Sequence, residues 1–268
     1  MTPRRNDWNA ATYGDGFADV YDDWYADVTD IEGTVAEMVR LGGPILELGI
    51  GTGRLALAMT DAGLEVHGVD ASRAMVDKLR TKPGGEHIPV LVADMSAELP
   101  AGPFATILVA YNTLFNLYEP GQQERLIALA ATRLAPGGHL VIEAAVPSDP
   151  SSAATKASGD TANTGRDGDR SDQVRVRSIE PDRVVLSVSV FDGRDNTALG
   201  QFVDISADGI TMRPWRIRMA TPAELDAMAA RAGLQLISRT SSWDGAEFDM
   251  TSTLHISTYR QVTTRGLG

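Results

Sequence analysis

The sequence contains no cysteine among its 268 residues. This absence excludes a disulfide framework, cysteine-ligated zinc or iron–sulfur sites, and a thiolate nucleophile. Positive charge is also scarce, with 24 Lys and Arg against 36 Asp and Glu and a net charge of −12. A protein that wraps a phosphate backbone needs clustered Lys and Arg, so we expect no nucleic-acid partner.

Long apolar runs are absent as well. The longest are about 6 to 8 residues, which suits buried strands and is too short for a membrane span. The first residues include Arg4 and Arg5 but continue with polar and acidic residues, so we find no secretory signal. We therefore expect a cytoplasmic protein that has no membrane partner.

The first half of the chain alternates between short apolar runs and helical patterns. Strand patterns lie at residues 45–48, 65–69, 88–93, 105–110 and 139–146, and helical patterns at 52–61, 72–82 and 122–134. This alternation is typical of parallel strands with helices on both faces of the sheet. A helix at 222–232 and strands at 234–241 and 252–259 complete the same sheet. The expected fold is α/β, a doubly wound, Rossmann-like sheet of seven strands.

Two segments interrupt this pattern after the fifth strand. Residues 148–173 contain no Val, Ile, Leu or aromatic residue, so they cannot offset their ordering entropy by burial. We predict a flexible loop there, either a lid or a tolerated insertion. Residues 174–219 switch to a period of two with turn signals, which predicts an inserted antiparallel β cap on the substrate side.

The N-terminal segment, residues 1–42, carries aromatic residues at helical spacing. Phe17, Tyr21, Trp24 and Tyr25 recur at three- and four-residue intervals, which predicts two short helices between about residues 14 and 40. This face either packs on the core or acts as a lid. The core itself is expected to comprise residues 43–147 and 220–268.

A glycine-rich turn follows the first strand, in the run Glu47-Leu48-Gly49-Ile50-Gly51-Thr52-Gly53. Glycines at alternating positions let the backbone pass close under a ligand. The second strand ends at Asp70, whose carboxylate is suited to the two hydroxyls of a ribose. The third strand ends at Asp94-Met95, which adds a second acid and a thioether suited to an adenine face. Parallel strands bring all of these ends to one edge of the sheet.

These features together resemble the class I S-adenosyl-L-methionine (SAM)-dependent methyltransferases, and Leu134-Ala135-Pro136-Gly137-Gly138 before the fifth strand continues the resemblance. The cofactor roles that it implies are these: Gly49, Gly51 and Gly53 border the methionine part, Glu47 orients the loop, Asp70 holds the ribose, Ala71 packs near the adenine, and Asp94 and Met95 address the adenine edge. Within this family, Tyr13 and Tyr21 in an aromatic N-terminal segment resemble small-molecule methyltransferases of bacterial natural-product pathways, including aminosugar N-methyltransferases. That resemblance implies that both tyrosines lie near the sulfonium or its carboxylate.

The fourth strand ends in Tyr111 and Asn112, which in this family lies beside the transferable methyl group. Asn112 is a candidate for orienting the substrate, whereas Tyr111 contacts the cofactor or substrate or packs in the wall. Methyl transfer is an in-line displacement that needs no strong base. Tyr21 is a candidate proton acceptor, and His255 is a candidate catalytic residue because the last strand of this fold starts near the active edge.

The predicted cap carries Arg213, Trp215, Arg216 and Arg218 in an otherwise acidic protein. These arginines either hold a carboxylate or phosphate of the substrate or pair with the Asp and Glu residues of neighbouring strands. No His, Asp and Glu spacing suggests a metal site. A homodimer through the cap or the helices is compatible with the sequence, although no coiled coil or repeat indicates one.

The expected function is SAM-dependent methyl transfer to a small-molecule acceptor, with an amine slightly favoured over a hydroxyl. One alternative is a nicotinamide-dependent oxidoreductase, because the glycine turn and Asp70 also suit a dinucleotide. In this alternative, Asp94 and Met95 have no role in binding the cofactor. The other alternative is a SAM-binding protein that transfers no methyl group.

Overall fold

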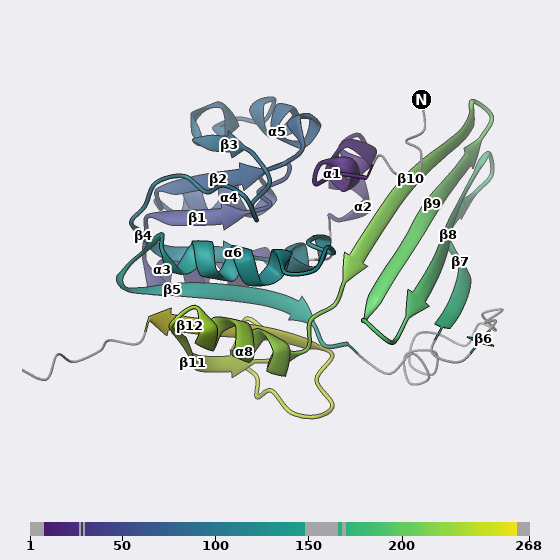
Figure 1. Ribbon diagram of the computed structural model, residues 1–268. Helices are drawn as coiled ribbons and strands as arrows, with labels where there is room; N and C mark the ends of the chain where they lie inside the picture. Colours follow the sequence, from purple (N-terminus) through teal and green to yellow (C-terminus); the bar gives the residue numbers. More distant parts are fainter. Residues whose placement is uncertain (1–7, 27, 29, 148–165, 168–169, 262–268) are drawn as a thin grey trace, which may run out of the picture.

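The computed structural model describes residues 8–26, 28, 30–147, 166–167 and 170–261. Its main part is a seven-stranded sheet in the order β11-β12-β5-β4-β1-β2-β3 (Figure 1). The strands are β1 (Ile45–Leu48), β2 (Val66–Asp70), β3 (Val90–Val92), β4 (Phe104–Val109), β5 (Leu134–Ala145), β11 (Leu234–Thr240) and β12 (Leu254–Gln261). Strands β1 to β5 pair in parallel, and β12 runs antiparallel to both β5 and β11. The predicted seven-stranded fold is confirmed.

Helices cover both faces of this sheet. They are α3 (Ile31–Leu41), α4 (Arg54–Asp61), α5 (Arg73–Arg80), α6 (Gln122–Ala131) and α8 (Pro222–Arg231), with short 3-10 turns η1 (Gly85–His87) and η2 (Thr113–Asn116). One core joins α6 and α8 to the sheet, and a second joins α3, α4 and α5 to its other face. All four residues of β1 are buried, as expected for a strand covered on both sides.

The N-terminal segment forms three helices, not the two expected from the sequence: α1 (Thr12–Phe17), α2 (Tyr21–Trp24) and α3. α1 and α2 are short, and α1 packs between α5 and the second sheet (Figure 1). Phe17 is fully buried there, with its ring 5.7 Å from that of Phe202 on the second sheet. Within the part of the chain that is described, no helix has the length and apolar character needed to cross a bilayer.

The second sheet is the predicted cap, inserted between β5 and α8. It is antiparallel, in the order β10-β9-β8-β7-β6, with β6 (Arg166–Asp167), β7 (Arg170–Glu180), β8 (Arg183–Asp192), β9 (Thr197–Ser206) and β10 (Gly209–Arg218). The predicted loop at 148–173 falls mostly outside the described residues. Its end requires a correction, because residues 170–173 already belong to β7. Their backbone pairs with residues 189–192 of β8, so these polar residues are ordered by sheet hydrogen bonds without apolar burial.

Candidate active site

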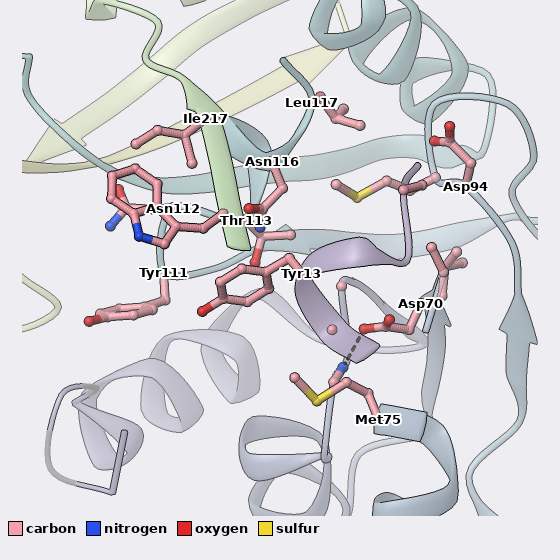
Figure 2. A pocket seen from close by; sticks show the side chains of 18 of the residues that line it. Tyr13, Asp70, Met75, Asp94, Tyr111, Asn112, Thr113, Asn116, Leu117 and Ile217 are labelled. Carbon is pink, nitrogen blue, oxygen red and sulfur yellow. Dashed lines mark hydrogen bonds between the residues drawn. The ribbon is translucent and has the colours of Figure 1, made fainter. Parts of the chain in front are cut away.

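A cavity of about 320 Å³ lies at the carboxyl ends of β1, β2 and β4, beneath α1, α2 and the cap. The strand order reverses between β1 and β4, the place where open α/β sheets bind ligands. Ten residues predicted for the site line this cavity: Tyr13, Tyr21, Gly49, Gly51, Asp70, Ala71, Asp94, Met95, Tyr111 and Asn112. In the view of Figure 2, Asp70 and Met75 stand at one end of the cavity, and Tyr111 and Asn112 at the other.

The glycine turn forms one wall of the cavity, and two of its glycines serve different purposes. Gly51 has φ +56°, and a Cβ built there would have no atom closer than 3.9 Å. Because glycine has no side chain, the backbone of Gly51 is directly exposed to the cavity. Gly53 has φ +79° and begins α4, and a Cβ there would lie 2.2 Å from a methyl carbon of Leu79. Gly53 therefore packs the turn against α5 and does not line the cavity.

Asp70 is the last residue of β2 and holds the glycine turn through hydrogen bonds. Its Oδ2 accepts the backbone N–H of Gly51 at 2.8 Å (Figure 2), and its Oδ1 accepts that of Ser72 at 2.8 Å. Burial raises the pKa of the Asp70 carboxyl above its ordinary value, and the two backbone donors partly oppose that rise. A carboxylate has about four acceptor positions. Two of them remain for hydroxyl donors of a ligand in the cavity.

Tyrosines from α1 and α2 form the opposite wall. The hydroxyl groups of Tyr13 and Tyr25 are 3.3 Å apart, and the rings of Tyr21 and Tyr25 are 4.8 Å apart. Burial raises the pKa of Tyr13 and of Tyr21 well above the ordinary tyrosine value. The guanidinium of Arg54 lies 6.0 Å from the centre of the Tyr21 ring. Both phenols therefore keep their protons at neutral pH.

Tyr111 and Asn112 follow β4 with φ values of +45° and +61°, in the left-handed region that non-glycine residues seldom adopt. Glu143 on β5 supports this conformation, because its Oε2 accepts the Tyr111 N–H at 2.8 Å. The Oδ1 of Asn112 accepts the backbone N–H of Ala145 at 2.6 Å. The amide NH₂ of Asn112 is therefore the end of this side chain left for a ligand. Strain held in this way is common at functional sites.

Three predicted residues do not line the main cavity. Glu47 is buried beneath the turn and borders a small adjoining space of about 20 Å³. Gly53 lies at the start of α4, as described above. His255 lies fully buried in β12, with its Nδ1 2.9 Å from Ser257 Oγ and its ring edge-on to Phe248. Burial lowers the pKa of His255 to about 4. Although β12 starts near the active edge, it turns this ring away from the cavity.

Sequence reasoning missed several lining residues, including Tyr25, Met75, Thr113, Asn116, Leu117, Tyr118, Gln122, Phe202 and Ile217. Trp215, noted in the cap, lines the cavity as well. The period-two pattern placed Trp215 and Ile217 on one face of β10. It contained no signal that this face is the one that covers the cavity.

The cap arginines pair with carboxylates that lie outside the cap, not on the neighbouring strands where the second interpretation expected them. Arg213 makes a two-pronged contact of 2.6 and 2.8 Å with Asp19. Arg216 lies 3.2 Å from Glu119, and Arg218 lies 2.8 Å from Glu224. None of the three arginines lines the cavity. Among the described residues, no group of three or more His, Asp or Glu side chains could hold a metal ion.

Comparison with known proteins gives the family. Residues 45–138 match a family described as "Methyltransferase domain". The CcbJ methyltransferase from Streptomyces caelestis is 32% identical, covers 95% of this chain and 100% of its own, and superposes with a TM-score of 0.81. The chain belongs to the SAM-dependent methyltransferases. This assignment rules out the nicotinamide alternative and makes the protein an enzyme.

Two other relatives of this methyltransferase are informative. The cypemycin N-terminal methyltransferase of a Streptomyces species is 27% identical over 207 residues, which is 77% of this chain and 78% of the relative. SAM-bound CalS10 from Micromonospora echinaspora, an amino pentose methyltransferase, shares the fold at 20% identity and a TM-score of 0.53, over 93% of this chain and 92% of its own.

The cavity fits the cofactor of this family. Its volume of about 320 Å³ lies in the range of small-ligand sites. The bare backbone at Gly51 and the two open acceptor positions of Asp70 face the same space, as a ligand rich in hydroxyl groups requires. SAM is the cofactor of this methyltransferase, and these residues suit it.

Proposed function

We propose that this methyltransferase transfers a methyl group from SAM to an amine of a small molecule. The observation that carries the choice of an amine is the absence of a general base in the described cavity wall near Tyr111 and Asn112, because the carboxylates of this wall, Asp70 and Asp94, stand at the opposite end of the cavity (Figure 2). The wall contains no histidine, burial keeps the phenol of Tyr21 protonated, and His255 lies elsewhere. A hydroxyl acceptor must lose a proton to become a good nucleophile. A neutral amine already carries a free lone pair.

In this proposal the cofactor is held by the predicted residues that surround the cavity. Gly49 and Gly51 border its methionine part, with Gly53 and Glu47 shaping the turn from behind. Asp70 accepts the ribose hydroxyls, and an adenine-binding end is formed by Ala71, Asp94 and Met95. Tyr13, Tyr21 and Tyr111 present aromatic faces and phenol oxygens at the other end, where a cation is stabilised. Bound SAM supplies a methyl group activated by its sulfonium.

The acceptor end of the cavity lies between Asn112 and the cap. The Asn112 NH₂ is a hydrogen-bond donor, so it would orient an oxygen of the acceptor and leave the amine lone pair free. Phe202, Trp215 and Ile217 supply an apolar roof that excludes water. We propose the cap, 174–219, as the substrate-side unit, and the N-terminal segment up to residue 42 as a lid whose tyrosines close the site.

The relatives support a small amine acceptor. The cypemycin enzyme is named as an N-terminal methyltransferase and CalS10 as an amino pentose methyltransferase. The net charge of −12 supports a small molecule over nucleic acid as the partner.

The test uses pairs of acceptors with the same skeleton, one with an amine and one with a hydroxyl, incubated with SAM. We expect methylated product, detected by mass spectrometry, from the amine members only. The logarithm of kcat/KM should rise with slope one and level off at the pKa of the amine itself. The Tyr21→Phe variant should keep this pH profile. Methylation of a hydroxyl member in preference to its amine counterpart would overturn the proposed acceptor class and leave the family assignment intact.

A further inference from the structure

Arg177 on β7 differs from most arginines of the cap sheet. Five of the others pair with carboxylates of the described residues: Arg183 with Asp204, Arg194 with Asp192, Arg213 with Asp19, Arg216 with Glu119 and Arg218 with Glu224. Arg177 has no carboxylate partner in the part of the chain that the structure describes, although acidic residues outnumber basic ones by 36 to 24. Its guanidinium is therefore available to an anion from outside the chain.

Aromatic rings hold the Arg177 guanidinium in place. Its central carbon lies 4.5 Å from the centre of the Trp24 ring, 5.5 Å from that of Tyr25 and 5.4 Å from that of Phe202. One of its N–H groups donates to the carbonyl of Trp24 at 2.8 Å. The pairing of β7 with β8 skips Arg177, and such irregularities in a strand re-aim side chains next to active sites. A guanidinium has five N–H groups, so four of them remain for a ligand.

The position of Arg177 is at the rim of the active-site cavity, near its acceptor end. Tyr25 and Phe202 line the cavity, whereas Arg177 itself does not and is exposed. The ring of Tyr25 lies 6.1 Å from that of Tyr111, which belongs to the acceptor end. Burial raises the pKa of Tyr111, and the charge of Arg177 is among the influences that oppose this rise. A ligand at the acceptor end therefore reaches Arg177 with a part that extends to the rim.

A second cation near these tyrosines, Arg54, has a different position. Arg54 begins α4 directly after the glycine turn, and it borders the small space beneath the turn together with Glu47 and Gly49. The glycine turn is the cofactor side of the site, which favours Arg54 as the partner of an anionic group on the cofactor. Arg177 belongs to the cap, the unit that we propose for the acceptor. An anion at Arg177 is therefore expected to come from the acceptor.

We propose that Arg177 is a specificity-determining residue that binds a carboxylate of the acceptor at the rim of the cavity. The proposal rests on the proposed function, because it concerns the same acceptor. It narrows the substrate class to small amines that carry a carboxylate several bonds away from the methylated nitrogen. The planar guanidinium matches a carboxylate with two parallel hydrogen bonds. The aromatic rings stabilise the guanidinium without neutralising its charge.

The test measures the binding of ω-amino carboxylic acids, from glycine to ε-aminocaproic acid, and of their carboxamides. Calorimetry uses protein saturated with S-adenosylhomocysteine, the demethylated product of SAM. An acid and its amide have nearly the same shape and differ in the charge of the distal group. At the best chain length, we expect the wild type to bind the acid about 10- to 100-fold more tightly than the amide, as for other hydrogen bonds to charged groups. Arg177→Gln should bring this ratio close to one.

The matched control is Arg175→Gln. Arg175 is an exposed residue of the same strand, and no aromatic ring of the described chain holds its guanidinium. The control removes the same charge from the cap, so it should keep the wild-type ratio of acid to amide affinity. Both variants should bind SAM as tightly as the wild type does.

Several results would overturn the proposal. One is equal affinity of the wild type for acids and amides at every chain length, and another is an equal loss of the ratio in Arg175→Gln. An Arg177→Gln variant that weakens acid and amide by the same factor would show that Arg177 only supports the lid through Trp24. Loss of SAM affinity with an unchanged ratio would assign Arg177 to the cofactor.

These outcomes are separate from a failure of the proposed amine acceptor. The product analysis described above detects a hydroxyl acceptor directly, whereas the ratio of acid to amide affinity reports only on the distal group. If the acceptor is a hydroxyl, ω-hydroxy acids and their amides replace the amine series, and the same comparison of Arg177→Gln with Arg175→Gln decides the role of Arg177.

Discussion

Glu47 allows a quantitative test of how the turn is built. It lies in β1 beneath the glycine turn, 4% exposed, and its Oε2 has no hydrogen-bond partner among the described residues. Burial raises the pKa of Glu47 to about 8 from an ordinary value of 4.5, with Arg54 opposing the rise and Asp70 adding to it. The folded protein should therefore keep this proton at pH values where the unfolded chain has released it.

The sign of the pH dependence follows directly. Below pH 4.5 the carboxyl is protonated in both states, and above pH 8 it is ionised in both. Between these values unfolding releases a proton, so the free energy of unfolding falls as the pH rises. One pKa unit corresponds to about 1.4 kcal/mol, so the whole window lowers the free energy of unfolding by about 5 kcal/mol.

The perturbation is Glu47→Gln, which keeps the shape of the side chain and removes its titration. We expect the variant to exceed the wild type in stability by an amount that grows between pH 5 and pH 8.5, reaching about 3 kcal/mol near neutrality. Urea denaturation of the cofactor-free proteins measures this difference, in which contributions from all other titrating groups cancel. Glu98→Gln, at an exposed position, is the control. Parallel pH curves for Glu47→Gln and the wild type would refute the reasoning.

Three further predictions concern the site and its surroundings. Asp70→Ala should weaken binding of SAM and of its demethylated product by about 1–3 kcal/mol in calorimetry, and unchanged affinity in a folded variant would remove Asp70 from the site. Gly53→Ala should destabilise the fold by about 2–4 kcal/mol because of its positive φ and the contact with Leu79. Gly63→Ala, where φ is +87° and no atom lies within 4 Å, should cost less, and equal losses would contradict the steric argument. Arg213→Met should loosen the contact between α1 and β10, because Arg213 also donates to the carbonyl of Gly16 at 2.6 Å. Limited proteolysis should then cut the N-terminal segment faster than in the wild type. An unchanged cleavage rate would show that Arg213 does not hold α1 in place.

Much of the core could be read from the sequence because its signals are local. The alternation of apolar runs and helical patterns sets the strands and helices, and parallel strands must place their carboxyl ends at one edge. The sequence therefore predicts Gly51, Asp70, Asp94 and Met95 at one edge of the sheet, and all four line one cavity there. The start of β7 was harder to find, since sheet hydrogen bonds order its first residues without an apolar pattern.

Only the tertiary structure decided which distant segments meet at this cavity. Trp215 and Ile217 are more than 100 residues from Tyr111 in the sequence, and their period-two spacing fixes a shared face but not what that face covers. The position of His255 could not be predicted for the same reason. The direction of a strand determines at which edge of the sheet it begins, whereas the pleat determines which way each side chain points. The sequence determined the sheet and the cofactor edge through local periodicity. The roof of the cavity and its tyrosine wall depend on how the chain folds back on itself, which local periodicity does not encode.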